Sequence, residues 1–147
     1  MDNSLCVENM SRNLRAFTVG VGVIAALSSA VMTLLYYDVP SGVALIMWGS
    51  LTAAGFVTAA MAASKKILLA VLLVFPAALL FGLENGLWQL AGKPADHIGA
   101  EGFVIVLLMS IPFGAFLCAV GGVLGWLVTR HSTHNKALQD DARSARA

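Results

Sequence analysis

The sequence predicts an all-α integral membrane protein, a four-helix antiparallel bundle with both termini on the cytoplasmic side. Hydrophobic residues make up 59% of the 147 residues and charged residues only 12%, and the mean hydropathy is +0.83. A water-soluble domain needs a more charged exterior than this. Apolar segments long enough to span a bilayer as helices are separated by short polar segments. They cover residues 16–37, 42–64, 67–90 and 103–129, between a polar N-terminal segment, 1–15, and a polar tail, 130–147.

The first apolar segment, residues 16–37, follows Arg12 and Arg15. A cleaved signal peptide is the competing interpretation, because a basic segment precedes the apolar run. The run continues beyond the roughly 7–15 apolar residues of a signal peptide, which favours a retained membrane helix. Small and hydroxylated residues recur on one side of it, among them Gly22 and Ser29. We predict that these two residues pack against another helix.

The second and third segments are predicted to form a hairpin. Residues 42–64 carry small residues on two sides, so we expect this helix to lie between two neighbours. Lys65 and Lys66 leave room only for a very tight turn before the third segment. Pro76 lies near the middle of that segment, where it should kink the helix and leave the carbonyl of Leu72 without its usual donor.

The fourth segment, residues 103–129, contains no charged residue. At about 1.5 Å per residue it makes roughly 40 Å of helix, enough to cross a bilayer with some tilt. Pro112 lies at a depth similar to that of Pro76 in the preceding segment. Small residues gather on one side, so we expect another helix to approach that side closely. The helix-packing positions predicted there are Gly114, Cys118, Gly121 and Gly125.

Lysine and arginine fall almost entirely on one side of the predicted membrane domain. An even number of crossings places all of them except Lys93 on the side of both termini. The acids Asp38, Glu84, Asp96 and Glu101 share the side of Lys93. By the positive-inside rule, both termini are therefore cytoplasmic and the acidic loops face outward. Short loops and the lack of an organelle-targeting segment lead us to expect the inner membrane of a bacterium.

Three residues on the predicted outer side are the candidates for chemistry: Glu84, Asp96 and His97. A carboxylate near lipid can couple a proton or bind a cation. Carboxylates beside an imidazole are also the types that hold a metal or perform acid–base catalysis. However, no ligand spacing such as HExxH is present, and an interfacial carboxylate beside a solvated loop explains the same residues. We therefore predict no catalytic centre, no metal and no cofactor.

The small-residue pattern predicts a function through helix packing, as an accessory, assembly or regulatory membrane protein rather than an enzyme. The expected partners are the lipid bilayer and either further copies of the chain or a larger membrane complex, with no nucleic acid. The alternative is a small oligomeric transporter or channel that uses Glu84 and a mid-membrane cavity near Pro76 and Pro112. An enzyme at the outer face acting through Glu84, Asp96 and His97 is a third hypothesis, without a motif to support it.

Overall fold

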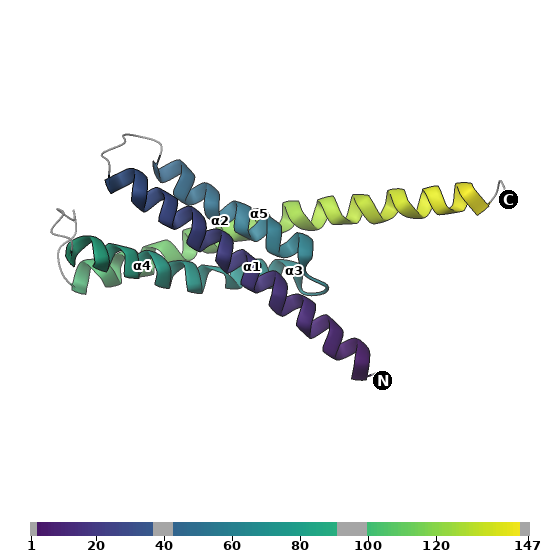
Figure 1. Ribbon diagram of the computed structural model, residues 1–147, viewed down its shortest axis with the longest axis horizontal. Helices are drawn as coiled ribbons and strands as arrows, with labels where there is room; N and C mark the ends of the chain where they lie inside the picture. The colour runs from purple at the N-terminus through teal and green to yellow at the C-terminus, as the bar shows by residue number, and fades with distance from the viewer. Residues whose placement is uncertain (1–2, 37–42, 91–99, 145–147) are drawn as a thin grey trace.

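The chain is all-helical throughout the part that the structure describes. The computed structural model describes residues 3–36, 43–90 and 100–144, and these are helical except for residues 62–65 and Leu73. Side chains are described for residues 7–30, 33, 46, 48–83, 108 and 111–132. The predicted all-α class is therefore confirmed for these residues. Figure 1 shows the helices α1 (Asn3–Tyr36), α2 (Val43–Met61), α3 (Lys66–Leu72), α4 (Val74–Leu90) and α5 (Ala100–Ser144).

Three stretches of these helices are long and apolar enough to cross a membrane. They are Val7–Ala30 in α1, Lys66–Leu83 in α3 and α4, and Ile111–Ser132 in α5. These stretches overlap the first, third and fourth predicted spans. The second predicted span, residues 42–64, corresponds to α2, which is not among the three. The helices are thus compatible with a membrane protein, and four crossings stay a prediction.

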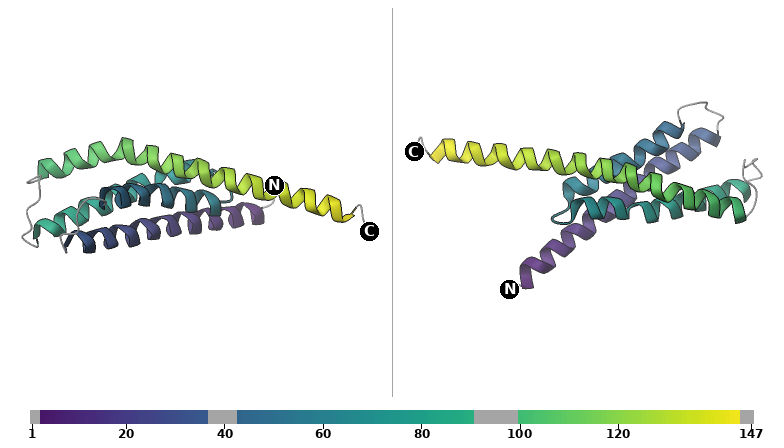
Figure 2. Two further views of the ribbon diagram at one scale, coloured as in Figure 1. Left: turned by 90° about the horizontal axis from the view of Figure 1, so that it is seen from above. Right: turned by 180° about the vertical axis from the view of Figure 1, so that it is seen from behind.

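The polar segments at the two ends are helical as well. Helix α1 already begins at Asn3, so the boundary predicted at residue 15 lies inside a helix. Helix α5 begins at Ala100 and continues to Ser144, through most of the predicted polar tail. In Figures 1 and 2, the N-terminal part of α1 and the C-terminal part of α5 project beyond the other helices. Each of these two helices therefore passes between polar and apolar sequence without an interruption of the helix.

The third predicted span is interrupted at Leu73, one turn before Pro76. The amide of Leu73 donates to the carbonyl oxygen of Ala70 at 3.2 Å, which is a tighter turn than an α-helix makes. The next helix starts with the amide of Ala77 donating to the carbonyl oxygen of Leu73 at 3.0 Å. Pro76 thereby lies in the first turn of α4, where a helix does not need its missing N–H. The predicted kink is present, but as a short break at Leu73.

Pro112 has a milder effect, because α5 stays helical through it. The left view of Figure 2 shows that α5 changes direction in its green N-terminal part. A proline inside a helix removes one hydrogen bond and crowds the preceding turn, which bends the helix.

Helix α2 lies at the centre of the arrangement. It packs against α1 on one side and α5 on another, and it also contacts α3. One of its sides is buried from Ser50 through Ala54 to Thr58, and Ala62 just after the helix is buried as well. The expectation that this helix lies between two neighbours is therefore confirmed.

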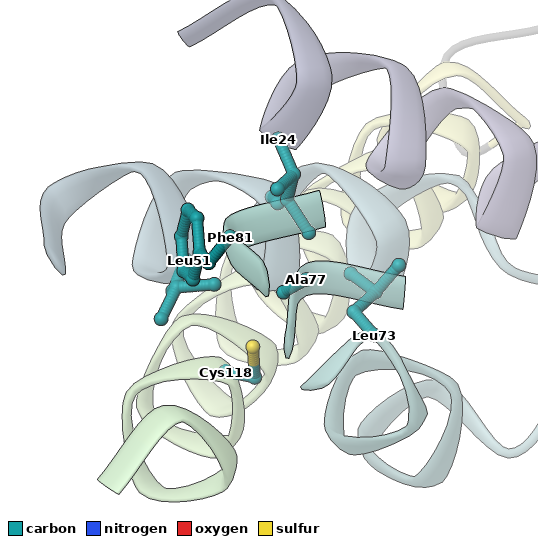
Figure 3. Packing of buried hydrophobic residues seen from close by; sticks show 7 residues of the cluster. Ile24, Leu51, Leu73, Ala77, Phe81 and Cys118 are labelled. Carbon is teal, nitrogen blue, oxygen red and sulfur yellow. The ribbon is translucent and has the colours of Figure 1, made fainter. Parts of the chain in front are cut away.

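The core is small and draws on every helix. Figure 3 shows Ile24 of α1 and Leu51 of α2 facing Ala77 and Phe81 of α4, with Leu73 and Cys118 beside them. Ile24, Leu73 and Cys118 are completely buried. Trp48 of α2 extends this packing by meeting the ring of Phe113 edge-on, at 4.7 Å and 82°.

Candidate functional site

The side chains of the acids and the histidine expected on the outer side lie outside the part of the chain that the structure describes. Glu84 lies in the backbone of α4, but its side chain is outside the described residues, and Asp96 and His97 lie wholly outside them. Among the described residues, no three side chains of His, Cys, Asp or Glu form a group that could hold a metal. Chemistry through Glu84, Asp96 and His97, and a mid-membrane cavity near Pro76 and Pro112, therefore stay predictions.

The small-residue side of α5 lies against α2. A β-carbon at Gly121 would collide with the carbonyl oxygen of Thr52, and one at Gly125 would collide with the carbonyl oxygen of Phe56. The two helices thus meet backbone to backbone at these glycines, which we call the α2–α5 contact. Close approach of this kind is what small residues permit between helices in lipid. The predicted packing positions are occupied by the chain's own helix, so they are not open to a partner.

Two further predicted positions of α5 lie along the same side. Cys118 is a free, buried thiol, and its carbonyl oxygen would be struck by a β-carbon at Gly55 of α2. A β-carbon at Gly114 would lie 3.0 Å from Cγ2 of Val74, so this glycine faces α4. The side of α5 that carries these residues is therefore enclosed by α2 and α4.

Helices α1 and α2 meet at a glycine that the sequence pattern did not single out. A β-carbon at Gly20 would collide with Oγ1 of Thr58. The same hydroxyl donates to the carbonyl oxygen of Ala16 at 3.3 Å, and Thr58 is completely buried. Small-residue spacing favours Gly22, because Thr18 and Ser29 share its side, whereas Ile24 follows Gly20 by one turn. The contact at Gly20 depends instead on where the neighbouring helix lies. Such a hydrogen bond between helices contributes about 0.6 kcal/mol on average in a membrane protein.

The side of α1 that faces away from the other helices is small and hydroxylated. We call it the outer face of α1. At Gly22 no atom lies within 4 Å of where a β-carbon would be, and Ser29 is exposed. The hydroxyls of Thr18 and Thr33 donate to carbonyl oxygens of their own helix, at 3.0 and 2.9 Å. Its exposed members are Thr18, Gly22, Ala26, Ser29 and Thr33.

The exposed faces of α3, α4 and α5 have the opposite composition, whereas α2 exposes the small residues Gly49 and Ala53 as well as Ile46 and Met61. On α3 and α4, Leu72, Phe75, Leu79 and Leu83 are all exposed. Between Ala16 and Ala30, by contrast, Val19 is the one exposed large hydrophobic residue of α1. Bulky apolar side chains suit contact with lipid tails, whereas small residues suit contact with another helix. On α5 the exposed bulky residues are Leu108, Phe113, Phe116, Val120, Val123, Leu124, Trp126, Leu127 and Val128.

A polar network closes one end of the helices. The side-chain oxygen of Asn13 accepts hydrogen bonds from the amides of Ala63 and Ser64, at 3.0 and 3.2 Å. Its side-chain nitrogen donates to the hydroxyl of Ser64 at 2.9 Å. Asn13 of α1 thus satisfies the backbone of the turn between α2 and α3. The turn itself uses Lys65 in the left-handed conformation, with φ of 49°.

Lysine and arginine side chains surround this turn. Lys66 donates from its ammonium to the hydroxyl of Thr129 at 3.0 Å, and that hydroxyl donates to the carbonyl oxygen of Trp126. The guanidinium of Arg130 lies 5.4 Å from the ring centre of Trp126, within the range of a cation–π interaction. We call this region the basic end. Its cations are Arg12, Arg15, Lys65, Lys66 and Arg130.

An open cavity of about 390 Å³ lies at the basic end. Its polar lining residues are Ser64, Lys65 and Lys66. Its apolar lining residues are Ala63, Ile67, Leu68 and Trp126. Every buried side-chain nitrogen or oxygen among the described residues has a hydrogen-bond partner.

No protein-family model matches the sequence, and no curated protein or solved structure matches it either. Two features of the geometry therefore bear on function: the outer face of α1 and the basic end.

Proposed function

We propose that the chain is an integral membrane protein built as a four-helix antiparallel bundle, with both termini on the cytoplasmic side of a bacterial inner membrane. The bonds of Asn13 to the turn and of Thr58 to Ala16 support opposite directions for α1 and α2. The cations of the basic end support the orientation, because positively charged segments are retained in the cytoplasm.

In this bilayer the protein acts as an accessory, assembly or regulatory subunit, and the outer face of α1 binds a transmembrane helix of another chain. The composition of that face supports the proposal. Where α3, α4 and α5 expose leucine, phenylalanine and valine, α1 between Ala16 and Ala30 exposes glycine, alanine, serine and threonine, with Val19 as the one large exposed residue. The partner helix belongs either to a second copy of the chain or to a larger membrane complex.

The physical reason lies in how helices associate in lipid. Lipid tails are as apolar as leucine, so no hydrophobic force brings two helices together there. Association depends on close van der Waals contact, which small residues allow over several turns. The open space at Gly22 and the internally bonded hydroxyls of Thr18 and Thr33 give a partner a shallow face on which these two hydroxyls are already satisfied.

Purification of the tagged protein from native membranes in mild detergent tests this proposal. We expect a species larger than the 15.4 kDa chain with its detergent. Gly22→Leu should abolish that species by filling the open space on α1 with a bulky side chain. Ser29→Leu, about two turns further along the same face, should do the same.

Gly49→Leu in α2 is the matched control. At Gly49, too, no atom lies within 4 Å of where a β-carbon would be, so the fold should tolerate this substitution equally well. We expect the larger species to survive it, with unchanged helix content by circular dichroism for all three variants. A wild-type protein that is monomeric in several mild detergents contradicts the proposal. So does a complex that is lost with Gly49→Leu but kept with Gly22→Leu.

A further inference from the structure

The cavity at the basic end lies where the helices change from apolar to polar. The apolar stretch of α3 and α4 starts at Lys66, and that of α5 ends at Ser132. A membrane that covers these stretches therefore has its surface near Lys66. Ile67 and Leu68 lie toward the hydrocarbon from this level, and Lys65 lies toward water.

The lining residues of the cavity match the two parts of a phospholipid. Lys65 and Lys66 supply ammonium groups for a phosphate, and Lys66 uses only one of its three donors on Thr129 in the bond described above. Ile67, Leu68 and Trp126 supply apolar contact for an acyl chain. A tryptophan such as Trp126 is typical of the membrane–water boundary, where its ring has one apolar and one wet edge.

The charge around the cavity is strongly biased. Among the charged side chains that the structure describes, Glu8 is the one acid, against the five cations of the basic end. Arg12 lies next to Asn13, which is bonded to the turn, and Arg130 lies over Trp126 of the cavity. Basic pockets of this kind between membrane helices bind anionic headgroups.

We propose that this cavity binds an anionic phospholipid, with the phosphate of its headgroup paired to Lys65 and Lys66. The acyl chain lies along Ile67, Leu68 and Trp126. A free phosphate ion would use only the polar lining residues, so the apolar lining residues favour lipid as the source of the phosphate. The site does not involve the outer face of α1, and its test is independent of the proposed partner.

The test measures binding of phosphatidylglycerol and phosphatidylcholine to the purified full-length chain by native mass spectrometry. At about fivefold per cation near the surface, the two lysines should favour phosphatidylglycerol by about 25-fold. The double variant K65N/K66Q should bring that ratio close to one. Asparagine tolerates the left-handed backbone at Lys65, and glutamine keeps a donor for Thr129. K93Q, which removes the lysine between α4 and α5, should leave the ratio unchanged.

Salt provides a second measurement on the unmodified protein, in case the double variant does not fold. Raising the salt from about 0.1 M to 1 M shortens the screening length from about 10 Å to about 3 Å. The preference for phosphatidylglycerol should then fall by more than about fivefold.

Four results would overturn the assignment. Equal binding of the two lipids by the wild type would show that headgroup charge does not determine binding. An unchanged ratio in K65N/K66Q or in high salt would show that the two lysines do not select the lipid. Displacement of phosphatidylglycerol by millimolar inorganic phosphate makes the cavity an anion site and not a lipid site. A dimer that forms only with Lys65 and Lys66 intact, and excludes lipid, assigns the cavity to a second copy of the chain.

Discussion

Replacing Gly121 with alanine should separate α5 from α2. The added β-carbon would collide with the carbonyl oxygen of Thr52 and lie 2.9 Å from the amide nitrogen of Phe56. Both neighbours are backbone atoms, so no change of rotamer relieves the contact. The helices have to move apart, and every other contact along the α2–α5 pair is loosened with them.

The size of the effect follows from these distances. Carbon atoms approach favourably at about 3.5–4.0 Å, so a contact of 2.9 Å requires the helices to move by at least about 0.6 Å. A gap of that size already loses a quarter or more of the attraction between facing atoms. Overpacking of this kind costs about 1–3 kcal/mol, and the better helix propensity of alanine offsets up to about 1 kcal/mol. We expect a net loss of about 1–2 kcal/mol in the free energy of unfolding, a factor of about 5–30 in the folded-to-unfolded ratio.

Unfolding by sodium dodecyl sulfate in mixed micelles, followed by far-ultraviolet circular dichroism, measures this change. Gly22→Ala is the control, because its β-carbon meets no atom within 4 Å. It should be neutral or stabilising by up to about 1 kcal/mol, as expected for alanine in place of glycine inside a helix. The reasoning is refuted if the free energies of unfolding of the two alanine variants differ by less than about 0.5 kcal/mol. A difference of that size is typical of surface substitutions without a specific structural cause.

Substitutions at three further positions can be followed in the same way. Asn13→Ala should lower the free energy of unfolding by about 1–3 kcal/mol through the lost bonds to the turn, whereas Asn13→Asp keeps the acceptor and should lose less. Thr58→Val should cost about 0.6 kcal/mol, the mean value for a hydrogen bond between membrane helices, and Thr58→Ser should restore most of it. Pro76→Ala supplies an amide for the carbonyl of Leu72, so hydrogen exchange at residue 76 should be slow and α3 should continue into α4.

Each of these has an outcome that contradicts it. Equal stability of Asn13→Ala and the wild type would mean that water replaces the side chain at the turn without loss. Equal stability of Thr58→Val would mean that the packing at Gly20, and not the hydrogen bond, holds α1 against α2. Rapid exchange of the new amide at residue 76 would mean that the break at Leu73 does not depend on the proline.

The helices themselves were largely predictable from the sequence. Two apolar runs separated by a lysine pair are enough to predict the tight turn between α2 and α3, because so few residues connect the two helices. The small residues on both sides of α2 predicted its place between neighbours. The spacing of small residues along one helix can be read directly from the sequence, because it depends only on the helical period.

Helix ends and long-range polar contacts were not predictable in this way. Nothing in the polar tail stops a helix, since alanine, glutamine and arginine favour one, and α5 continues to Ser144. Asn13 looks like one polar residue among many, and its partners lie 50 and 51 positions away. The choice between Gly20 and Gly22 likewise depends on where a neighbouring helix lies, which small-residue spacing within α1 does not contain.

The α2–α5 contact also limits how the molecule can move. At Gly121 and Gly125 the two main chains lie so close that a β-carbon on α5 would collide with the backbone of α2. Rotation of α5 about its axis by one residue would bring Val120 against α2 and move Gly122 away from Ala70. The close packing at these glycines therefore opposes rotation of α5 relative to α2.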